Sequence, residues 1–585
     1  MPDNYTLPSM LQASCRQFAG KPAHFTKVGG KFQPVTYTDL RLRVVEIAFG
    51  LKSLGVENGA TVAIFAESSS KWSIADWAIT SIGAVSVPIF PTLTPETVRY
   101  ILRDSGCKAV FVGDAKLLKK LEEAVFDSEL QVLPIIMEGE ATYTWQKLID
   151  DGMQAGTSLD DWIAFTKSVQ PTDVAAIIYT SGTTGEPKGA VLTHEAFAYQ
   201  CAMVRKNLPV DDTDRFLSFL PMSHVYERMG GHYFPISAGC EVAFADSLKS
   251  LSADIIATKP TVMTVVPRFL ENVRTKVLAA MEEAPALRKR LFQIALAQGA
   301  KRISNNGKPV GIIGRLLDKL VGSKIRDKFG GRLRFMVSGG AALPQDVAVF
   351  YAAFGIKLLQ GYGLTETAPV ISLNHPDRNK PDSVGEILEG LDVKIASDGE
   401  IIMNGPTRLL RYHNKPEETA EAIDSDGYFH TGDIGTLKGN RLWITDRKKD
   451  ILVMSNGKNV APAAIEGRLK ASPYIEEAMV IGDGMDHIAA LIVPCFETLN
   501  HFAHQHGIIT SHHHEVASHP EVTALIKKEI EAANKGLADF EKVKGHKILS
   551  APWTIDTGEL TPSLKVKRPV IREKYTNEID ELRKR

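Results

Sequence analysis

The sequence predicts an α/β fold divided between a large N-terminal domain and a small C-terminal α+β domain. In the first two-thirds of the chain, short apolar segments alternate with helical segments, a pattern typical of layered and largely parallel sheets. The chain has 585 residues, more than one hydrophobic core usually accommodates. Near residue 440 the pattern changes, because a charged segment, residues 446–450, precedes a second and smaller series of strands and helices.

The first elements can be placed individually. Residues 62–66 and 86–90 are apolar enough for buried strands, and residues 72–82 between them have the composition of a buried helix. A further helix is predicted from residue 94 to 106. The side chain of Thr94 can cap its first turn, a proline suits the first helical position and a glycine ends it.

Residues 281–329 form a helical insert between the strand-and-helix units. Apolar residues at helical spacing begin it, Gly307-Lys-Pro interrupts it, and a second helix is predicted around residues 316–328. Residues 301–334 contain ten Lys and Arg against two Asp. Two interpretations remain open: a solvated helix face, or a contact with anions such as a membrane surface or the phosphates of a cofactor.

Composition excludes several classes of protein. The formal net charge is -1, from 68 basic and 69 acidic residues, so a general nucleic-acid binder is not expected. The N-terminus lacks the pattern of a signal peptide, and the most apolar stretch, residues 74–90, contains Asp76 and Pro88. Five isolated cysteines suggest reduced thiols in the cytoplasm. Residues 501–519 hold seven histidines without metal-site spacing and are predicted to form an exposed loop.

The strongest chemical signal is a loop after the apolar strand of residues 175–180. Its sequence is Ser181-Gly-Thr-Thr-Gly-Glu-Pro-Lys188-Gly. Glycines free the backbone, while three hydroxyls and an ammonium group lie in the same turn, which suits the oxygens of a triphosphate. The loop is not a Walker A sequence, because a glycine and not Ser or Thr follows the lysine.

Together with five later segments, this loop resembles the adenylate-forming AMP-binding superfamily, which includes acyl-CoA synthetases, luciferases and peptide-synthetase adenylation domains. The later segments are, in order, Ser338-Gly-Gly-Ala-Ala-Leu, Gln360-Gly-Tyr-Gly-Leu-Thr-Glu-Thr, His430-Thr-Gly-Asp433, Thr445-Asp-Arg447-Lys-Lys-Asp450 and Leu560-Thr-Pro-Ser-Leu-Lys565-Val-Lys-Arg. The resemblance covers nearly the whole chain. It implies layered sheets with a distorted β-barrel in the N-terminal domain, residues 1–448, and a mobile C-terminal domain, residues 449–585.

The resemblance also implies an ATP site. It assigns to this site Thr180, Ser181, Gly182, Thr183, Thr184, Gly185, Lys188, Gly339, Gly340, Ala341, Gln360, Gly361, Tyr362, Gly363, Asp433 and Arg447. The chemistry fits: the ring of Tyr362 can stack on adenine, the carboxylate of Asp433 suits paired ribose hydroxyls, and Arg447 is a permanent cation. Thr184 and Glu366 are implied ligands of Mg2+, and Thr365 is implied to reach the α-phosphate.

Lys565 is the residue that the resemblance implies for catalysis. A carboxylate and an anionic α-phosphate repel each other, and a lysine between them neutralises the charge that builds up in the transition state. Lys449 is implied as the hinge about which the C-terminal domain rotates. This rotation would replace Lys565 with Gly457 and its neighbours at the thioester site, where CoA enters. The family often has Ser-Gly-Gly in that loop, whereas this chain has Ser455-Asn-Gly, so its CoA contacts stay open.

Within the superfamily, residues 220–228, residues 266–271 and the basic insert resemble long-chain acyl-CoA synthetases. His224 is carried over as a substrate-binding residue; a packed histidine is the alternative. The expected activity is ATP-dependent activation of a long-chain fatty acid, followed by thioester formation with CoA. The rivals are a fatty acyl-AMP ligase or another adenylating enzyme that does not use CoA, and a non-catalytic nucleotide-binding or membrane-uptake protein. A cytoplasmic enzyme that docks peripherally on membranes is expected, and the resemblance allows a homodimer.

Overall fold

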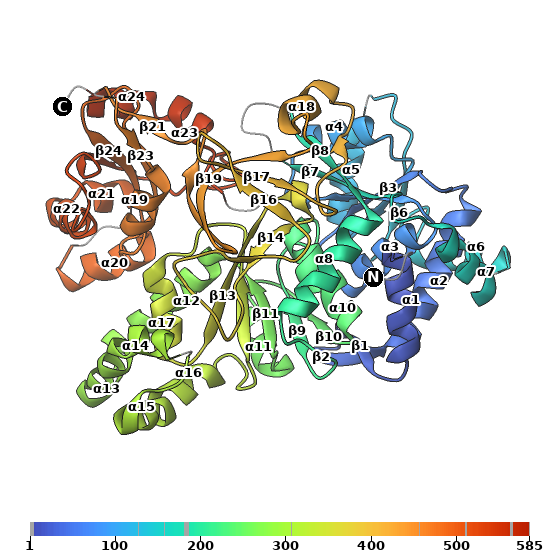
Figure 1. Ribbon diagram of the computed structural model, residues 1–585, viewed down its shortest axis with the longest axis horizontal. Helices are drawn as coiled ribbons and strands as arrows, with labels where there is room; N and C mark the ends of the chain where they lie inside the picture. The colour runs from blue at the N-terminus through green and yellow to red at the C-terminus, as the bar shows by residue number, and fades with distance from the viewer. Residues whose placement is uncertain are drawn as a thin grey trace.

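The chain folds into a large N-terminal domain built on two sheets and a smaller C-terminal domain. The computed structural model describes residues 5–126, 128–156, 158–180, 186–305, 307–455, 457–508, 512–561 and 565–583. Figure 1 shows the C-terminal domain at the upper left and the first helices of the chain at the right. The predicted two-domain α/β fold is confirmed. In these described ranges, no helix is both long enough and apolar enough to cross a membrane.

The first sheet has seven strands, of which five are parallel. Its order is β18 (Arg411–Tyr412), β8 (Lys188–Thr193), β7 (Val174–Thr180), β4 (Val85–Ile89), β3 (Thr61–Phe65), β5 (Ala109–Val112) and β6 (Leu133–Ile136). The strands from β7 to β6 are parallel, whereas β8 and β18 run antiparallel to their neighbours. The late strand β18 therefore lies beside the hairpin that carries the predicted phosphate loop.

The second sheet has thirteen strands and changes direction along its width. Its order is β16 (Asp392–Ile395), β17 (Glu400–Asn404), β19 (Phe429–Lys438), β20 (Arg441–Arg447), β15 (Gly385–Ile387), β14 (Val370–Leu373), β13 (Lys357–Gly363), β12 (Phe335–Ser338), β11 (Val262–Val265), β9 (Arg215–Ser218), β10 (Glu241–Phe244), β1 (Pro22–Val28) and β2 (Lys31–Thr36). Strands β13 to β1 are parallel, and both flanks are antiparallel. Within the described residues no pairing joins the edge strands, so the distorted barrel stays a prediction.

Helices cover both sheets. Those of the first half are α1 (Leu7–Gln17), α2 (Tyr37–Ser53), α3 (Ser70–Ser81), α4 (Pro95–Ser105), α5 (Ala115–Val125), α6 (Trp145–Gln154), α7 (Leu159–Ser168) and α8 (His194–Asn207). After them come α9 (Val225–Glu227), the π-helix η1 (Arg228–Tyr233), α10 (Phe234–Ala238), α11 (Leu251–Thr258), α12 (Pro267–Glu282), α17 (Gln345–Ala353), the short η3 (Thr365–Thr367) and α18 (Pro416–Ala422). Helix α4 confirms its predicted signals, because Thr94 caps it and Gly106 ends it at a φ of 66°.

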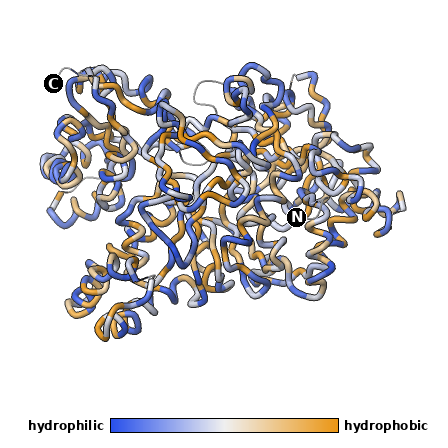
Figure 2. Tube along the Cα trace, viewed as in Figure 1, coloured by the Kyte–Doolittle hydropathy of each residue, from blue (hydrophilic) through white to orange (hydrophobic). Residues whose placement is uncertain are grey.

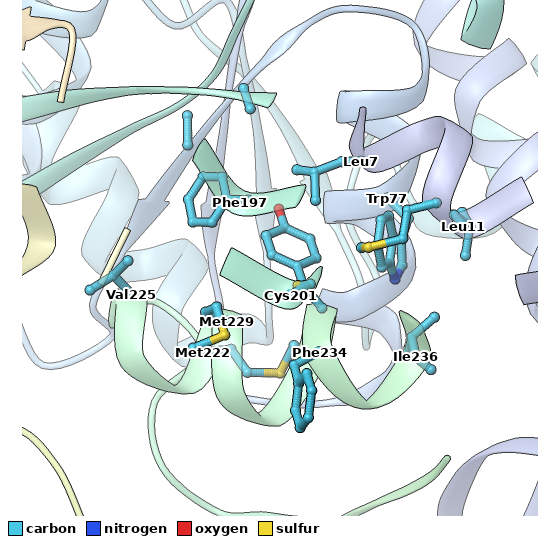
Figure 3. Close-up of a cluster of buried hydrophobic side chains, with 14 of the residues drawn as sticks. Leu7, Leu11, Trp77, Phe197, Cys201, Met222, Val225, Met229, Phe234 and Ile236 are labelled. Atoms are coloured by element: carbon cyan, nitrogen blue, oxygen red, sulfur yellow. The ribbon is translucent and has the colours of Figure 1, made fainter. Parts of the chain in front are cut away.

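The core of the N-terminal domain joins helices from distant parts of the sequence. Figure 3 shows Leu7 of α1, Trp77 of α3 and Cys201 of α8 in one cluster with Phe234 of α10. A buried ion pair lies in the same region: Arg228 of η1 donates from Nε to Asp76 of α3 at 3.1 Å. Because both side chains are fully buried, removal of one partner would leave an unpaired charge and cost about 3–5 kcal/mol.

The helical insert lies within the predicted range but is less regular than predicted, and its second half begins earlier. It consists of α13 (Ala286–Ala297), α14 (Gly299–Ser304), α15 (Gly311–Leu317), the π-helix η2 (Asp318–Gly322) and α16 (Ser323–Asp327). Its second half becomes helical at Gly311, because the chain can re-enter a helix directly after the interruption that ends at Pro309. Two of its arginines, Arg302 and Arg326, pair with Asp318 at 2.8 Å and are therefore internal.

The C-terminal domain is an α+β unit. It contains the strand pair β21 (Leu452–Val453) and β22 (Asn459–Val460), and the sheet β23 (Ile475–Ile481), β24 (Ile488–Pro494) and β25 (Val543–Ile548). Its helices are α19 (Pro462–Leu469), α20 (Phe496–Gln505), α21 (His513–Ser518), α22 (Pro520–Ala533), α23 (Arg568–Lys574) and α24 (Thr576–Arg583). The predicted histidine-rich loop is exposed, but most of its described residues lie in α20 and α21, so the prediction of a loop was wrong. Nonpolar residues such as Leu499 and Val516 anchor these helices, an effect that histidine content does not reveal.

Candidate active site

A deep pocket lies where the two domains meet. It encloses about 790 Å³ of space, part of which is open to solvent. The N-terminal domain contributes most of the lining, and Lys565 comes from the C-terminal domain. The pocket therefore brings together residues that are separated by more than three hundred positions in the sequence.

The pocket runs along the parallel strands and has a polar and an apolar part. Gly339 follows the carboxyl end of β12, whereas Val262 opens β11 and lies opposite Phe335 at the start of β12. Four residues of strand separate these two levels, which corresponds to roughly 13 Å. The apolar part of the lining consists of Val204, Leu208, Phe216, Phe234, Val262, Val370 and Leu373. Such a cavity suits an elongated apolar ligand.

The hairpin of β7 and β8 brings the phosphate loop to this region. Thr180 and Lys188 are paired across the hairpin, at the ends of the two strands that flank the loop sequence. The predicted residues Ser181, Gly182, Thr183, Thr184 and Gly185 lie outside the described residues. The ammonium group of Lys188 lies 5.5 Å from the ring centroid of Tyr412 in β18. The hydroxyl of Tyr412 in turn donates to Oε1 of Glu366 at 2.9 Å.

A second polar group surrounds Tyr362, which lines the pocket. Strands β19 and β20 pair Asp433 with Arg447, and the Nε atom of Arg447 lies 3.1 Å from Oδ1 of Asp433. The hydroxyl of Tyr362 donates to the other carboxylate oxygen at 2.7 Å. The carboxylate of Asp433 is thus fixed between a tyrosine and an arginine, and the Arg447 side chain is half exposed.

Close backbone packing explains two of the predicted glycines. A Cβ atom on Gly339 would lie 3.0 Å from the ring of Tyr226, and one on Gly363 would lie 1.6 Å from the carbonyl oxygen of Pro369. The hydroxyl of Tyr226 donates to the carbonyl of Val337 at 2.8 Å, which holds its ring against Gly339. The glycines therefore allow the pocket wall to form.

Eight of the described residues that the resemblance assigned to ATP, Mg2+ or CoA do not line the pocket: Thr180, Lys188, Ala341, Gln360, Glu366, Asp433, Arg447 and Gly457. The Gln360 amide donates to the carbonyl of Pro381, away from the site, and Ala341 is exposed beyond Gly340. Gly457 lies in the turn between β21 and β22 at a φ of 77°, and it too is exposed. Gly340, Gly361, Tyr362, Gly363 and Thr365 do line it.

Lys565 has an altered acidity in this setting. Burial and the positive charge of Arg447 lower the pKa of its ammonium group, the carboxylates of Asp433 and Glu366 partly offset them, and the resulting pKa is about 8. The side chain nevertheless retains accessible surface, because it faces the open pocket while protein surrounds its other sides. A lysine with this pKa is still mostly protonated at neutral pH.

His224 faces the same pocket in neutral form. Burial lowers the pKa of its imidazole to about 4, and the charge of Lys565 adds to this effect. Its Nδ1 atom accepts the backbone N–H of Tyr226 at 3.1 Å. The proton of the neutral ring is therefore on Nε2, which can donate a hydrogen bond to a ligand.

A buried carboxyl group supports the wall next to His224. The two oxygens of Glu227 accept hydrogen bonds from the hydroxyls of Ser218 and Thr264, each at 2.6 Å. Burial raises the pKa of this carboxyl group to about 7. A Cβ atom on Gly231 would lie 2.3 Å from Glu227, so the π-helix η1 is packed closely on this side chain.

One group of ion pairs joins the C-terminal domain to the N-terminal domain, and another lies just before the predicted hinge. Arg268 of α12 pairs with Glu476 and Glu477 of the C-terminal domain, both at 2.6 Å. At the predicted hinge, Lys448 pairs with Glu400 at 3.0 Å. Lys449 follows in the turn after β20.

Sequence reasoning missed several supporting residues, above all Tyr226, Tyr412 and Arg268. Tyr412 ends the segment from Gly405, which has fewer glycines than the resemblance leads one to expect. This difference from the family pattern was the one sign in the sequence that the segment around Tyr412 has a role of its own. No spacing rule indicates the interdomain contacts of Arg268.

The fold and this site define an adenylate-forming enzyme, and comparison with known proteins supports this class. Residues 11–413 match the AMP-binding enzyme family, and residues 449–585 match the AMP-binding enzyme C-terminal domain. The chain belongs to the AMP-binding enzyme family.

Several relatives are similar over most of their length. The long-chain-fatty-acid–CoA ligase FadD15 of Mycobacterium bovis is 35% identical, over 94% of this chain and 93% of the relative. The peroxisomal long chain acyl-CoA synthetase 6 of Arabidopsis thaliana is 31% identical, over 95% of this chain and 82% of the relative. Long-chain-fatty-acid–CoA ligase 1 of Homo sapiens is 31% identical, over 89% and 78%.

Solved structures share the fold at lower identity. The anthranilate CoA ligase AuaEII in complex with anthranoyl-AMP has a TM-score of 0.74 at 20% identity, with 99% of both chains covered. The adenylation domain of a carboxylate reductase from Mycobacterium chelonae has a TM-score of 0.77 at 22% identity and covers 99% of this chain and 91% of that one.

Proposed function

We propose that this protein is a long-chain fatty acid–CoA ligase that works through an acyl-adenylate. The observation that carries this proposal is the single pocket in which Lys565, His224 and Thr365 meet an apolar lining. The names of the relatives that are 31–35% identical support the same substrates, a long-chain fatty acid, ATP and CoA.

In the first half-reaction, a carboxylate oxygen of the fatty acid attacks the α-phosphorus of ATP. The new bond is the mixed anhydride of acid and AMP, and the bond to the β-phosphate oxygen breaks, so pyrophosphate leaves with its electron pair. Lys565 lies between the reacting anions and offsets their repulsion, which is worth about 100- to 1000-fold in rate. The Nε2–H group of His224 orients the carboxylate, and Thr365 contacts the α-phosphate.

The nucleotide contacts follow from the walls described above. Adenine stacks on Tyr362 and packs against the backbone of Gly339 and Gly340. Asp433 accepts hydrogen bonds from the ribose hydroxyls, and Arg447 reaches ribose or phosphate. The triphosphate lies against Thr180, Lys188 and the loop of residues 181–185.

Mg2+ is proposed at Glu366, together with Thr184. Within the described residues, only Oε1 of Glu366 accepts a side-chain hydrogen bond, so its other oxygen suits a hard cation. When bound, Mg2+ neutralises phosphate charge. Tyr412 holds the Glu366 carboxylate in the orientation that the ion needs.

In the second half-reaction, the CoA thiolate attacks the acyl carbon, the thioester forms and AMP leaves. We propose that residues 449–585 rotate about Lys449 between the two steps, withdrawing Lys565 and bringing Gly457 to the thioester site. The exposed position of Gly457, away from the pocket, supports this order of events. One closed site cannot hold both the lysine and the incoming pantetheine.

The proposal extends to the cellular setting. The free cysteines fit the cytoplasm, and the basic insert suggests reversible peripheral attachment to a membrane, where long-chain acids partition. The homodimer that the resemblance allows can be tested by light scattering during gel filtration.

The decisive experiment is product analysis with palmitate, Mg2+ and ATP, with and without CoA. Palmitoyl-CoA, AMP and pyrophosphate are expected in equal amounts. Formation of AMP and pyrophosphate without a thioester would instead identify an adenylating enzyme that does not use CoA.

The role of Lys565 is tested by Lys565→Ala, with Lys567→Ala as the matched control. Acid-dependent exchange between ATP and pyrophosphate should fall about 100- to 1000-fold in the first variant only, while ATP affinity measured by calorimetry changes little. Unchanged exchange in Lys565→Ala would remove its assigned role.

A further inference from the structure

The helical insert carries an unusual exposed ridge. On α15 and η2, the side chains of Ile312, Ile313, Leu316 and Leu320 are 82%, 67%, 56% and 43% exposed. They lie at helical spacing and form one stripe. On the same helices Gly314, Leu317 and Gly322 are buried against the protein. This segment is therefore apolar on both sides, although only one side is covered.

The neighbouring helix α13 extends the ridge. It packs against α15 and η2, and its Leu287 is 71% exposed. Figure 1 shows α13 and α15 at a corner that projects from the molecule, and Figure 2 shows hydrophobic segments at this corner. Soluble proteins rarely leave such a contiguous apolar surface uncovered unless it binds a partner.

Exposed basic side chains lie on the same insert, and two of them, Arg315 and Lys319, lie on α15 and η2 themselves. Arg302 and Arg326 form ion pairs with Asp318, and Arg334 forms an ion pair with Asp214. The remaining seven cations of residues 301–334 are exposed: Lys301, Lys308, Arg315, Lys319, Lys324, Lys328 and Arg332. Asp327 is the exposed acidic residue of this stretch. The excess of positive charge is therefore available to a partner, and that partner must be anionic.

We propose that this ridge, defined by Leu287, Ile312, Ile313, Leu316 and Leu320 with the exposed cations of residues 301–334, docks on the anionic surface of a lipid bilayer. Apolar side chains would enter the boundary between headgroups and acyl chains, while Lys and Arg contact the headgroups. A second copy of this chain fits less well, because its own ridge carries the same positive charge. The inference rests on the proposed membrane attachment and assigns it to particular residues.

Vesicle flotation with the full-length protein tests this assignment. Vesicles of phosphatidylcholine with 30 mol% phosphatidylglycerol are compared with pure phosphatidylcholine, at low and high salt. Three variants are compared with the unaltered protein: Ile312→Ser with Ile313→Ser, Arg315→Gln with Lys319→Gln, and Met153→Ser. Met153 of α6 is 60% exposed on a different part of the domain and serves as the matched control.

The unaltered protein and Met153→Ser should bind the anionic vesicles, and added salt should weaken this binding. The isoleucine pair should lower the partition coefficient at least about tenfold, and each neutralised cation should lower it about fivefold. Equal partitioning of all variants, or binding that ignores lipid charge, would overturn the assignment. A concentration-dependent dimer that only the isoleucine variant loses, without vesicle binding, would identify a second copy as the occupant.

Acyl-CoA formation from palmitate carried on serum albumin, without vesicles, is measured on the same samples. All variants should retain it, because the altered residues lie outside the pocket. If palmitoyl-CoA forms but vesicles are not bound, the docking ridge alone is wrong. If vesicles are bound but no thioester forms, the proposed reaction alone is wrong.

Discussion

As the pH rises, the Glu227→Gln variant should gain stability relative to the unaltered protein. Burial raises the pKa of this carboxyl group from its ordinary 4.5 to about 7, although hydrogen bonds from Ser218 and Thr264 favour the ionised form. The folded protein therefore binds this proton more tightly than the unfolded chain does. The stability that Glu227 contributes is fully present below pH 4.5 and is lost as the pH rises through 7.

The magnitude follows from the two pKa values. Between pH 5 and pH 8, ionisation of Glu227 removes about 2.5 kcal/mol from the free energy of unfolding. An amide of the same shape does not ionise, so Glu227→Gln should not lose this amount. The stability difference between variant and unaltered protein should thus shift by about 2.5 kcal/mol in favour of the variant over this range.

Urea unfolding followed by fluorescence at several pH values measures this difference. Glu531→Gln, on the exposed surface of α22, is the control and should show no comparable pH dependence. If the stability difference for Glu227→Gln changes by less than about 0.5 kcal/mol between pH 5 and pH 8, Glu227 is already ionised when folded and the reasoning fails.

Three further predictions concern the pocket and its closure. Arg268→Ala removes both ion pairs to the C-terminal domain. Pyrophosphate exchange should therefore slow severalfold, whereas thioester formation from added acyl-adenylate should not. Equal slowing of both reactions would contradict a positioning role for Arg268. Gly363→Ala places a Cβ atom against the carbonyl of Pro369 and should destabilise the protein by about 1–3 kcal/mol in urea unfolding, and an unchanged midpoint would mean that the wall relaxes freely. The kcat/KM of pyrophosphate exchange should decline above pH 8 as Lys565 loses its proton, and Arg447→Gln should move this decline to higher pH because it removes a neighbouring positive charge; a shift to lower pH would contradict this.

Local signals in the sequence predicted local structure well. The cap at Thr94 and the glycine at 106 fixed both ends of α4, because each acts within one turn of the helix. The strand before the phosphate loop could be predicted equally well, since residues 175–180 are a continuous apolar run. The resemblance then supplied the order of the motifs and assigned Tyr362 and Asp433 to the same ATP site, whereas their direct hydrogen bond was not predicted.

What the sequence could not provide was long-range pairing. Tyr412 reaches Glu366 only because β18 pairs with β8, a contact between segments more than two hundred residues apart. Counting charges in the insert could not show that Asp318 uses two of the arginines. Membership of a matching segment also did not guarantee that a residue contacts the ligand site. Gln360 belongs to such a segment, but its side chain donates a hydrogen bond to the carbonyl of Pro381.

The division of the pocket between two domains bears on how a reactive intermediate survives between steps. Tyr362, Asp433 and His224 all belong to the large domain, whereas Lys565 belongs to the small one. On the proposed mechanism, the groups that retain the mixed anhydride stay in place while the group that helped to form it departs. Pyrophosphate can then no longer reverse the reaction efficiently, because the reverse step needs the same lysine. Departure of Lys565 thus gives the two-step reaction its direction while the intermediate remains sheltered from water.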